Sequence, residues 1–151
     1  MNLNEDLYKE IILDHYKSKK NRKRLPDAAR HLEAANPSCG DDIDLYLEVE
    51  NGKIQDAAFE GMGCSICLAS ADMMCDAFRG KTLAEANSLI DKFKGMLTRN
   101  EVPEFPDEAA DLEAMQGVAK FPLRIKCALL AWTTAHQLVA EENKSEAEKS
   151  S

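Results

Sequence analysis

The chain has 151 residues, of which 44% are apolar, and this suffices for one hydrophobic core but not for a comfortable second one. Its 27 Asp and Glu residues against 19 Lys and Arg give a net charge of −8, which argues against a nucleic-acid-binding surface. The longest uninterrupted apolar run, residues 127–132, is far shorter than the ~20 residues that cross a bilayer, so no membrane location is expected. Residues 1–8 include Glu5 and Asp6 and lack the basic start and apolar stretch of a secretory signal, so we expect a cytoplasmic location.

The first predicted element is an amphipathic helix over residues 4–17. Leu3, Leu7 and Ile11 recur at every fourth position, which places them on one helix face. The helix ends in a basic stretch, residues 17–24. We interpret this stretch as a solvated loop because charge runs usually face water, and a docking patch for a partner is the alternative.

A β-hairpin is predicted over residues 42–59, where the apolar period changes from 3.6 to 2. On the expected buried face lie Ile43, Leu45, Leu47 and Val49, and on the expected solvated face lie Asp42, Asp44, Tyr46 and Glu48. The dipeptide Asn51-Gly52 supplies the turn, because both residues tolerate positive φ. A two-stranded hairpin is marginal alone, so helices or a third strand must cover it, and residues 28–34 are the candidate for that strand.

Two helices are predicted directly after the hairpin. Residues 65–79 carry apolar side chains at helical spacing, and Gly80 ends this helix. Thr82, with Glu85 three residues later, forms a capping box that opens the second helix.

The carboxyl-terminal part of the chain is also predicted to be mainly helical. Residues 107–115 suit a short acidic helix, and a last helix begins near Pro122 and runs to about Ala140. The tail, residues 141–151, is charged and almost without apolar residues, so we expect it to be disordered. The predicted fold class is α+β: residues 1–140 form one domain in which a small antiparallel sheet of two or three strands packs against four to five helices.

Five cysteines in a chain without a secretory signal indicate metal binding or sulfur chemistry rather than a disulfide framework. Cys39 precedes the hairpin and Cys64 follows it, so the chain reversal brings both to one end of the sheet. Cys127, in the first turns of the last helix, and Asp41, two residues after Cys39, complete a candidate site there. Three thiolates and one carboxylate are four ligands, the tetrahedral number for Zn²⁺.

Cys64 and Cys67 form a CxxC motif, which also suits a thiol-disulfide protein or half of a zinc site. No second CxxC motif and no thioredoxin-like βαβ pattern accompanies it. Cys67 and Cys75 lie among apolar residues of the predicted helix, so we interpret both as packed thiols rather than ligands.

Three segments resemble the cysteine motifs of the U-type iron-sulfur cluster assembly proteins. They are Asn36-Pro37-Ser38-Cys39-Gly40-Asp41, Gly61-Met62-Gly63-Cys64-Ser65-Ile66 and Arg124-Ile125-Lys126-Cys127-Ala128-Leu129-Leu130-Ala131-Trp132. Within that family the chain resembles the SufU branch rather than the IscU branch. IscU proteins have a histidine where this chain has Lys126, and they carry a Leu-Pro-Pro-Val-Lys motif that is absent here. SufU proteins carry an insertion between the second and third cysteines, and residues 80–121 have room for it.

The resemblance implies a protein that binds Zn²⁺ through Cys39, Asp41, Cys64 and Cys127 and accepts persulfide sulfur from a cysteine desulfurase. The resemblance to the SufU branch also implies that the desulfurase donates a histidine, which replaces one zinc ligand on docking. Cys39 is the predicted sulfur acceptor, with Cys127 as the second candidate. Such a chain is the sulfurtransferase partner of a desulfurase rather than a free-standing enzyme, and downstream assembly or acceptor proteins are further candidate partners.

Charge gives an independent argument about the site. Three thiolates, one carboxylate and Zn²⁺ sum to −2, which needs nearby cations if the site is partly buried. Arg124 and Lys126 are the candidates, with an ordinary solvated helix face as the alternative. The same ligands also suit iron or an iron-sulfur cluster, so a scaffold for cluster assembly is the alternative function. A purely structural zinc module is disfavoured because structural sites prefer cysteine and histidine over carboxylate.

Overall fold

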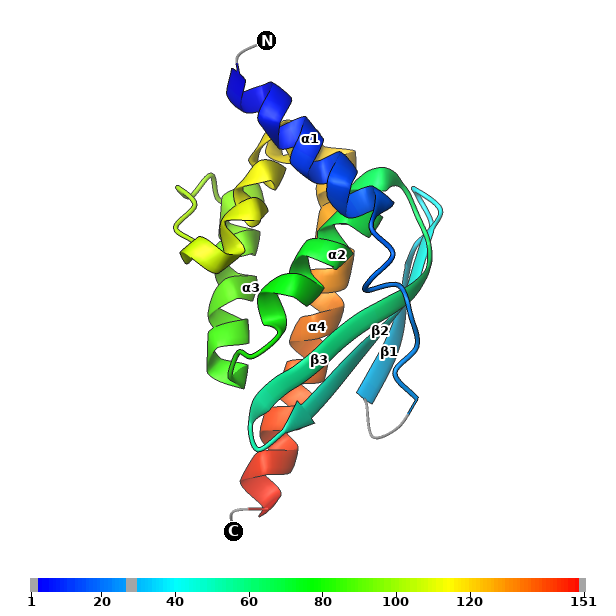
Figure 1. Cartoon of the computed structure of the whole chain (residues 1–151), viewed down its shortest axis with the longest axis vertical. Helices are drawn as coiled ribbons and strands as arrows, with labels where there is room; N and C mark the ends of the chain where they lie inside the picture. The colour runs from blue at the N-terminus through cyan, green and yellow to red at the C-terminus, as the bar shows by residue number, and fades with distance from the viewer. Residues whose placement is uncertain (1–2, 27–29, 150–151) are drawn as a thin grey trace.

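The protein is described by a computed structural model that covers residues 3–26 and 30–149. Within these residues the elements in chain order are α1 (Leu3–Lys17), β1 (Arg30–Asn36), β2 (Asp41–Glu50), β3 (Lys53–Met62), α2 (Ser65–Phe78), α3 (Leu83–Thr98), the 3₁₀ helix η1 (Asp107–Lys120) and α4 (Pro122–Lys149). Helices α2 and α4 contact the sheet, α3 packs against α4, and η1 packs against α2, α3 and α4 (Figure 1). The predicted α+β class, with a small antiparallel sheet against helices, is confirmed.

The sheet is antiparallel throughout, with the strand order β1-β2-β3. Asn51 and Gly52 form the predicted hairpin turn with φ values of 54° and 74°. The third strand is present as β1 and ends at Asn36, two residues later than predicted, whereas residues 28 and 29 of the prediction lie outside the described residues. β1 pairs with β2 up to Asn36↔Asp41, and β3 pairs with β2 up to Met62↔Asp42. The turn between β1 and β2 therefore lies at the end of the sheet where β3 terminates.

The inner face of β2 carries Ile43, Leu45 and Leu47, all with 0% exposure, as the alternation predicts. Tyr46, predicted on the solvated face, is only 5% exposed. Its ring stacks on His31 with centroids 5.3 Å apart, and its hydroxyl donates a hydrogen bond of 2.8 Å to a Glu60 carboxylate oxygen. Neighbouring side chains therefore cover the outer face at this position, which the period of the sequence does not reveal.

The basic stretch after α1 contributes more to the fold than a solvated loop would. The Phe59 amide donates to the Asn21 carbonyl (2.9 Å), and the Lys23 amide donates to the Phe59 carbonyl (3.0 Å), so this segment pairs with the free edge of β3. The side chains of Lys20 and Lys23 stay solvated, as predicted, whereas Asn21 is fully buried. The loop thereby covers an edge strand whose backbone groups would otherwise lack partners.

A buried hydroxyl joins α2 to α4. Ser70 donates to the Ala128 carbonyl at 2.6 Å and accepts from the Trp132 indole N–H at 2.9 Å. The Trp132 ring in turn stacks on Phe93 of α3, with centroids 4.2 Å apart. These contacts fix the height of α4 against α2, and with it the position of the residue that precedes Ala128.

Two predictions for the carboxyl-terminal part are wrong. Helix α4 does not end near Ala140 but continues to Lys149, so the described part of the tail is helical, and residues 150–151 lie outside the described residues. Once a helix is nucleated, each added residue gains a hydrogen bond, and Glu, Lys and Ala are good helix formers. The Arg30 guanidinium also pairs with Glu141 (3.6 Å) and with Glu142.

The predicted short acidic helix is longer than expected. It spans Asp107–Lys120 as η1, with non-helical φ and ψ at Ala109.

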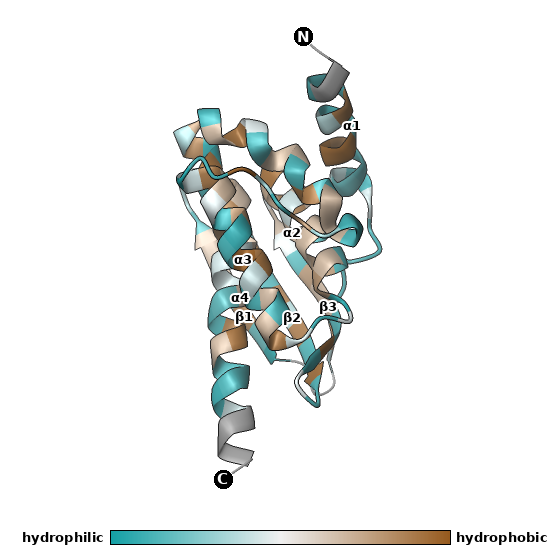
Figure 2. Ribbon diagram, turned by 90° about the vertical axis from the view of Figure 1, so that its left-hand side faces the viewer, coloured by the Kyte–Doolittle hydropathy of each residue, from teal (hydrophilic) through white to brown (hydrophobic). Residues whose placement is uncertain are grey.

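The part of α4 that extends beyond the sheet is mostly hydrophilic (Figure 2). None of the described helices is long and apolar enough to cross a membrane.

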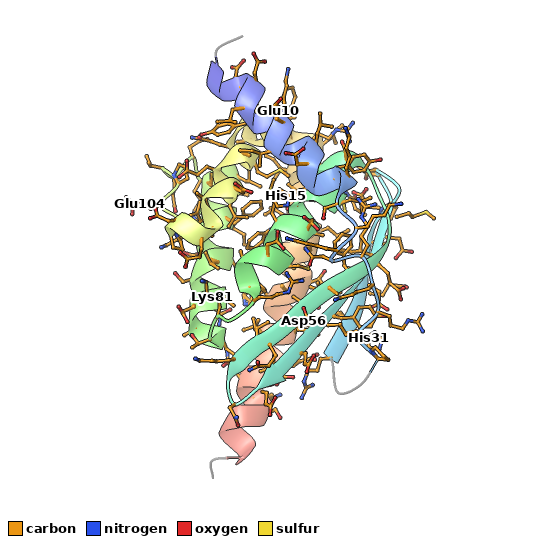
Figure 3. The ribbon with its side chains drawn as sticks, in the orientation of Figure 1. Glu10, His15, His31, Asp56, Lys81 and Glu104 are labelled. Atoms are coloured by element: carbon orange, nitrogen blue, oxygen red, sulfur yellow. The ribbon has the colours of Figure 1, made fainter. Side chains whose placement is uncertain are left out.

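His15 links α1 to α2 and η1 through both of its ring nitrogens. It lies between α1 and α2 (Figure 3), with Nδ1 2.5 Å from the buried Asp72 carboxylate and Nε2 2.9 Å from the Asp111 carboxylate. Two carboxylate partners require both nitrogens to donate, which is the imidazolium form. Burial lowers the pKa of His15, but the hydrogen bonds that its ring donates to Asp72 and Asp111, together with the charges of these carboxylates, outweigh burial and raise the pKa above 6.5.

We expect this contact to make stability depend on pH. Because the pKa of His15 is raised on folding, its contribution is fully present below about pH 6.5 and is lost as the pH rises through the folded pKa. His15→Gln should flatten this decline and lower the urea midpoint most at acidic pH. The matched control is His136→Gln, because His136 is exposed on α4. Equal pH profiles for the wild type and His15→Gln would contradict the assignment.

Candidate metal centre

The turn between β1 and β2 positions Cys39 and Asp41. The Cys39 amide donates to the Asn36 carbonyl at 3.1 Å, and Gly40 takes a φ of 70°, which a side chain would disfavour. Cys39 is half-buried at this turn. Asp41 is the first residue of β2 and is only 1% exposed, so its carboxylate faces the interior at the end of the sheet.

Cys64 reaches the same end of the sheet from β3. Gly61 pairs with Ile43 at a φ of 128°, where a Cβ atom would lie 2.2 Å from the Asp42 carbonyl oxygen, so only glycine fits. Two residues after the strand ends at Met62, Cys64 is the N-cap of α2. Its backbone N–H donates to Asp41 Oδ1 at 2.8 Å, which ties the start of α2 to the start of β2.

Cys127 comes from the first turns of α4 and is fully buried. The Leu123 carbonyl accepts from the Cys127 thiol at 3.7 Å and from the Cys39 thiol at 3.9 Å. The Asn36 amide Nδ2 lies 3.7 Å from Cys127 Sγ and donates to it. The last residue of β1 and the first turn of α4 therefore meet at this sulfur.

These placements form one cluster of potential ligands. The ligand atoms of Cys39, Asp41 and Cys127 all lie within 4.8 Å of one another, close to the separations of atoms that share one ion. Burial raises the pKa of the Cys127 thiol, and Cys39, Asp41 and Cys64 raise it further, which places Cys64 beside the group. The four predicted ligand residues thus meet at one end of the sheet, with Cys64 outside the closest three.

The donor set fits zinc. Asp41 Oδ2 is buried and has no hydrogen-bond partner among the described residues, although a buried carboxylate oxygen normally has one. Sulfur and carboxylate ligands suit Zn²⁺, and thiolate sites also take iron. A cation between Asp41 and the three sulfurs would supply the missing partner.

Of the two predicted supporting cations, one faces the site. The negative charge of the Cys64 thiolate raises the pKa of Arg124, and hydrogen bonds to Cys127 and Cys64 add to this effect. Lys126 is exposed, and the described part of the chain gives it no ion pair with a site residue. Arg124 is therefore the candidate that lies beside the sulfurs, and the electrostatic role of both residues stays a prediction.

Cys67 and Cys75 are both fully buried in the core, as predicted for packed thiols. Burial raises the pKa of each thiol, and for Cys67 the neighbouring Asp41, Cys64 and Cys39 contribute as well. Cys67 therefore lies next to the cluster but is not one of the three residues whose ligand atoms are closest together, Cys39, Asp41 and Cys127. Cys75, two turns further along α2, is remote from it.

The site has an exposed apolar rim that the sequence analysis did not identify. Met62 is 69% exposed at the end of β3, and Phe121 and Leu123 are 60% and 71% exposed around the start of α4. Exposed side chains of this size beside a functional cluster are typical of a partner surface. The sequence contained one indication of this rim, because Met62 lies two residues before Cys64, and Phe121 and Leu123 lie six and four residues before Cys127.

A second group of potential ligands lies elsewhere, at His15, Asp72 and Asp76. Here the carboxylates have other partners. Asn21 Nδ2 donates to Asp72 and Asp76, and Lys20 pairs with Asp76 at 3.1 Å. This group is explained as an ion-pair network that holds α1 on α2.

Comparison with known proteins agrees with the geometry. The family model described as the NifU-like N-terminal domain matches residues 7–128. The chain belongs to this family. It is 44% identical over 138 residues, 91% of this chain and 92% of the relative, to the zinc-dependent sulfurtransferase SufU of Bacillus subtilis. The predicted resemblance to U-type proteins of the SufU branch is confirmed.

Other members of the NifU-like family are named as scaffolds. The iron-sulfur cluster assembly scaffold protein IscU of Thermotoga maritima is 42% identical over 128 residues, which cover 85% of this chain and 89% of that protein. Among solved structures, a SufU from Fervidobacterium islandicum, described as a scaffold protein for the SUF system, superposes with a TM-score of 0.75 and 35% identity. That match covers 83% of this chain and 90% of the other.

We expect about one equivalent of tightly bound zinc in the purified chain. Ala at Cys39, Cys64 or Cys127 should release most of it, because each removes one of four ligands, and Asp41→Ala should weaken binding while three thiolates retain some metal. The measurement is zinc content after competition with a chelator. Cys75→Ala, which removes a buried sulfur remote from the cluster, is the matched control. Equal loss on Cys67→Ala would show that the ligand set is wrong.

Gly63 tests the position of Asp41 without removing a ligand. A Cβ atom there would lie 2.9 Å from Asp41 Oδ1 and 3.2 Å from Cys67 Sγ, so the carboxylate must move. We expect Gly63→Ala to weaken zinc binding by about tenfold, which is the lower end of the effect that is usual when a residue that orients a metal ligand is changed. Gly117→Ala is the control, because a Cβ at Gly117 meets nothing within 4 Å. Unchanged affinity in both variants would exclude Asp41 as a ligand.

Proposed function

We propose that the chain is a zinc-dependent sulfur acceptor in iron-sulfur cluster assembly, which takes persulfide sulfur from a cysteine desulfurase. The observation that carries this proposal is the cluster of Cys39, Asp41 and Cys127, with Cys64 beside it, in a close relative of a zinc-dependent sulfurtransferase. In this role the chain acts with a partner enzyme and does not turn over substrate alone.

Cys39, Asp41, Cys64 and Cys127 are the residues that would hold zinc. Bound Zn²⁺ does no redox chemistry and keeps its cysteines as thiolates at neutral pH. The protein contributes a partly enclosed site, an amide donor from Asn36 to Cys127 and the Arg124 charge, all of which favour sulfur anions.

Cys39 is the proposed acceptor because it is the most easily released of the three cysteines. It lies in a turn between Pro37 and Gly40 and is half-buried, whereas Cys64 caps α2 and Cys127 is buried within α4. A loop residue moves at less cost than a residue in a helix. Cys127 is the second candidate, since its sulfur lies within the same close group.

The transfer step is a thiol exchange. The Cys39 thiolate attacks the outer sulfur of the enzyme's persulfide, a new S–S bond forms on Cys39, and the desulfurase cysteine leaves as a thiolate. No oxidant is needed, because the sulfur moves with its oxidation state unchanged. Acceptance requires that the persulfide reach the turn, so the partner must dock on this end of the molecule.

The rim around the site is suited to that docking. Met62, Phe121 and Leu123 present exposed apolar surface, and Arg124 adds a positive charge on the same side. A desulfurase loop with an apolar tip and a carboxylate would match it, and a histidine from that loop would take the position that Cys39 vacates. Free cysteines are needed for every step, which favours a cytoplasmic, reducing compartment.

A scaffold that assembles an iron-sulfur cluster on the same residues is the second candidate. The relative from Thermotoga maritima carries that name, and three thiolates with one carboxylate also suit iron. The two functions differ in outcome, because a scaffold holds a coloured cluster whereas a zinc-bound acceptor is colourless and carries extra sulfur.

Sulfur transfer is tested with the zinc-bound chain, a cysteine desulfurase and cysteine. We expect the chain to raise desulfurase turnover and to gain one sulfur on Cys39. Trypsin separates the candidates, because Cys39, Cys64 and Cys127 fall on three different peptides bounded by Arg30, Lys53, Arg79, Lys126 and Lys144. Mass spectrometry of thiol-blocked peptides locates the sulfur.

The control for this experiment is Cys75→Ala, which should stimulate the enzyme as the wild type does. Added sulfur on the peptide of Cys127 would transfer the acceptor role to that residue. A zinc-bound chain that neither stimulates the enzyme nor gains sulfur, while its iron-loaded form builds a stable cluster, would establish the scaffold instead.

A further inference from the structure

Cys67 is a cysteine next to the site, within the described part of the chain, that neither zinc binding nor sulfur transfer uses. It is fully buried, and a Cβ atom on Gly63 would lie 3.2 Å from its Sγ and 2.9 Å from Asp41 Oδ1. Its backbone N–H donates to Cys64 Sγ at 3.5 Å. The Cys64 sulfur thus lies over the first turn of α2, on the side where Cys67 is placed.

This arrangement is that of a dithiol poised for oxidation. A CxxC motif at a helix start, with the first cysteine at the N-cap, is typical of thiol-disulfide proteins. Residues three apart on a helix hold their Cβ atoms about 5 to 6 Å apart, and a disulfide needs about 3.5 to 4.5 Å. A small movement of the first turn therefore closes the gap.

The two cysteines also differ in accessibility in a way that suits such chemistry. Cys64 is half-buried and reachable from solvent, whereas Cys67 lies behind it in the core. Cys39 and Cys127 direct their thiols to the Leu123 carbonyl. Cys67 is the cysteine closest to Cys64 in the sequence. The first turn of α2 also holds the Cys67 backbone N–H against the Cys64 sulfur.

We infer that Cys64 and Cys67 form a reversible disulfide when the site holds no metal and a peroxide is present, and that this bond prevents zinc from binding. The loss of sulfur acceptance that follows rests on the proposed function. The disulfide itself rests only on the geometry of the α2 start.

The chemistry balances with hydrogen peroxide as the oxidant. The Cys64 thiolate attacks one peroxide oxygen, the S–O bond forms as the O–O bond breaks, and hydroxide leaves, giving a sulfenic acid. The Cys67 sulfur then attacks the Cys64 sulfur, the S–S bond forms as the S–O bond breaks, and the oxygen leaves as water with the Cys67 proton. Two thiols are oxidised by two electrons, and a dithiol reductant reverses the bond.

The test uses the full chain after zinc removal by a chelator under reducing conditions. Because Cys64, Cys67 and Cys75 share the tryptic peptide 54–79, Cys75→Ala is the background, and thermal unfolding checks that it folds. After stoichiometric hydrogen peroxide and alkylation, we expect this peptide to lack two hydrogens and both alkyl groups, with Cys39 and Cys127 alkylated. The oxidised chain should lose zinc binding and regain it after dithiothreitol.

Two further samples complete the design. Zinc-loaded chain should resist the same treatment, because its Cys64 sulfur is engaged. Adding Cys67→Ala should leave zinc content unchanged but abolish the disulfide, so that Cys64 proceeds to the sulfinic acid. A bond between Cys39 and Cys127, or an oxidised Cys64 beside an alkylated Cys67, would overturn the inference.

The outcome is separable from that of the proposed function. A chain that forms the Cys64–Cys67 disulfide but gains no sulfur from a desulfurase supports the redox pair and contradicts the acceptor role. A chain that accepts sulfur but never forms this disulfide gives the opposite result.

Discussion

The buried carboxylate of Asp41 is the interaction on which the arrangement of this protein's functional end depends. One oxygen accepts the Cys64 amide at 2.8 Å, and the other is buried without a partner among the described residues. Burying such a group without compensation costs several kcal/mol, because water no longer stabilises its charge. A cation bound at this carboxylate would offset that cost, so the position of Asp41 at the start of β2 favours metal binding at this end of the sheet.

Three elements far apart in the sequence meet around that carboxylate, and each has its own restraint. The hairpin turn at Asn51-Gly52 fixes the register that returns β3 to the start of β2. The Cys64 amide fixes the start of α2. The Ser70 hydroxyl, bonded to Ala128 and Trp132, fixes α4 against α2 and thereby sets the depth of Cys127. Core packing remote from the site is therefore part of its geometry.

The sequence allowed the prediction of those features of the fold that depend on residues close together in the chain. The alternation in β2, the Asn-Gly turn and the capping box at Thr82 involve neighbours in the chain, and all three are present. The placement of Cys39, Asp41 and Cys64 at one end of the sheet followed from the hairpin, whereas the position of Cys127 depends on how α4 packs against α2. Burial of Tyr46 and the pairing of His15 with Asp72 and Asp111 depend on contacts between distant elements, which no local pattern records.

Cys64 joins the two chemistries of this site, because its sulfur has two partners that exclude each other. A thiolate that binds a metal is engaged and unavailable to a peroxide, and a sulfur in a disulfide carries no charge for a metal. Because zinc binds only the reduced chain, the fraction of molecules whose Cys64 can be oxidised falls as the zinc site is filled. The first turn of α2 thus connects metal occupancy to redox state through one sulfur, with Cys67 held in the core as the alternative partner.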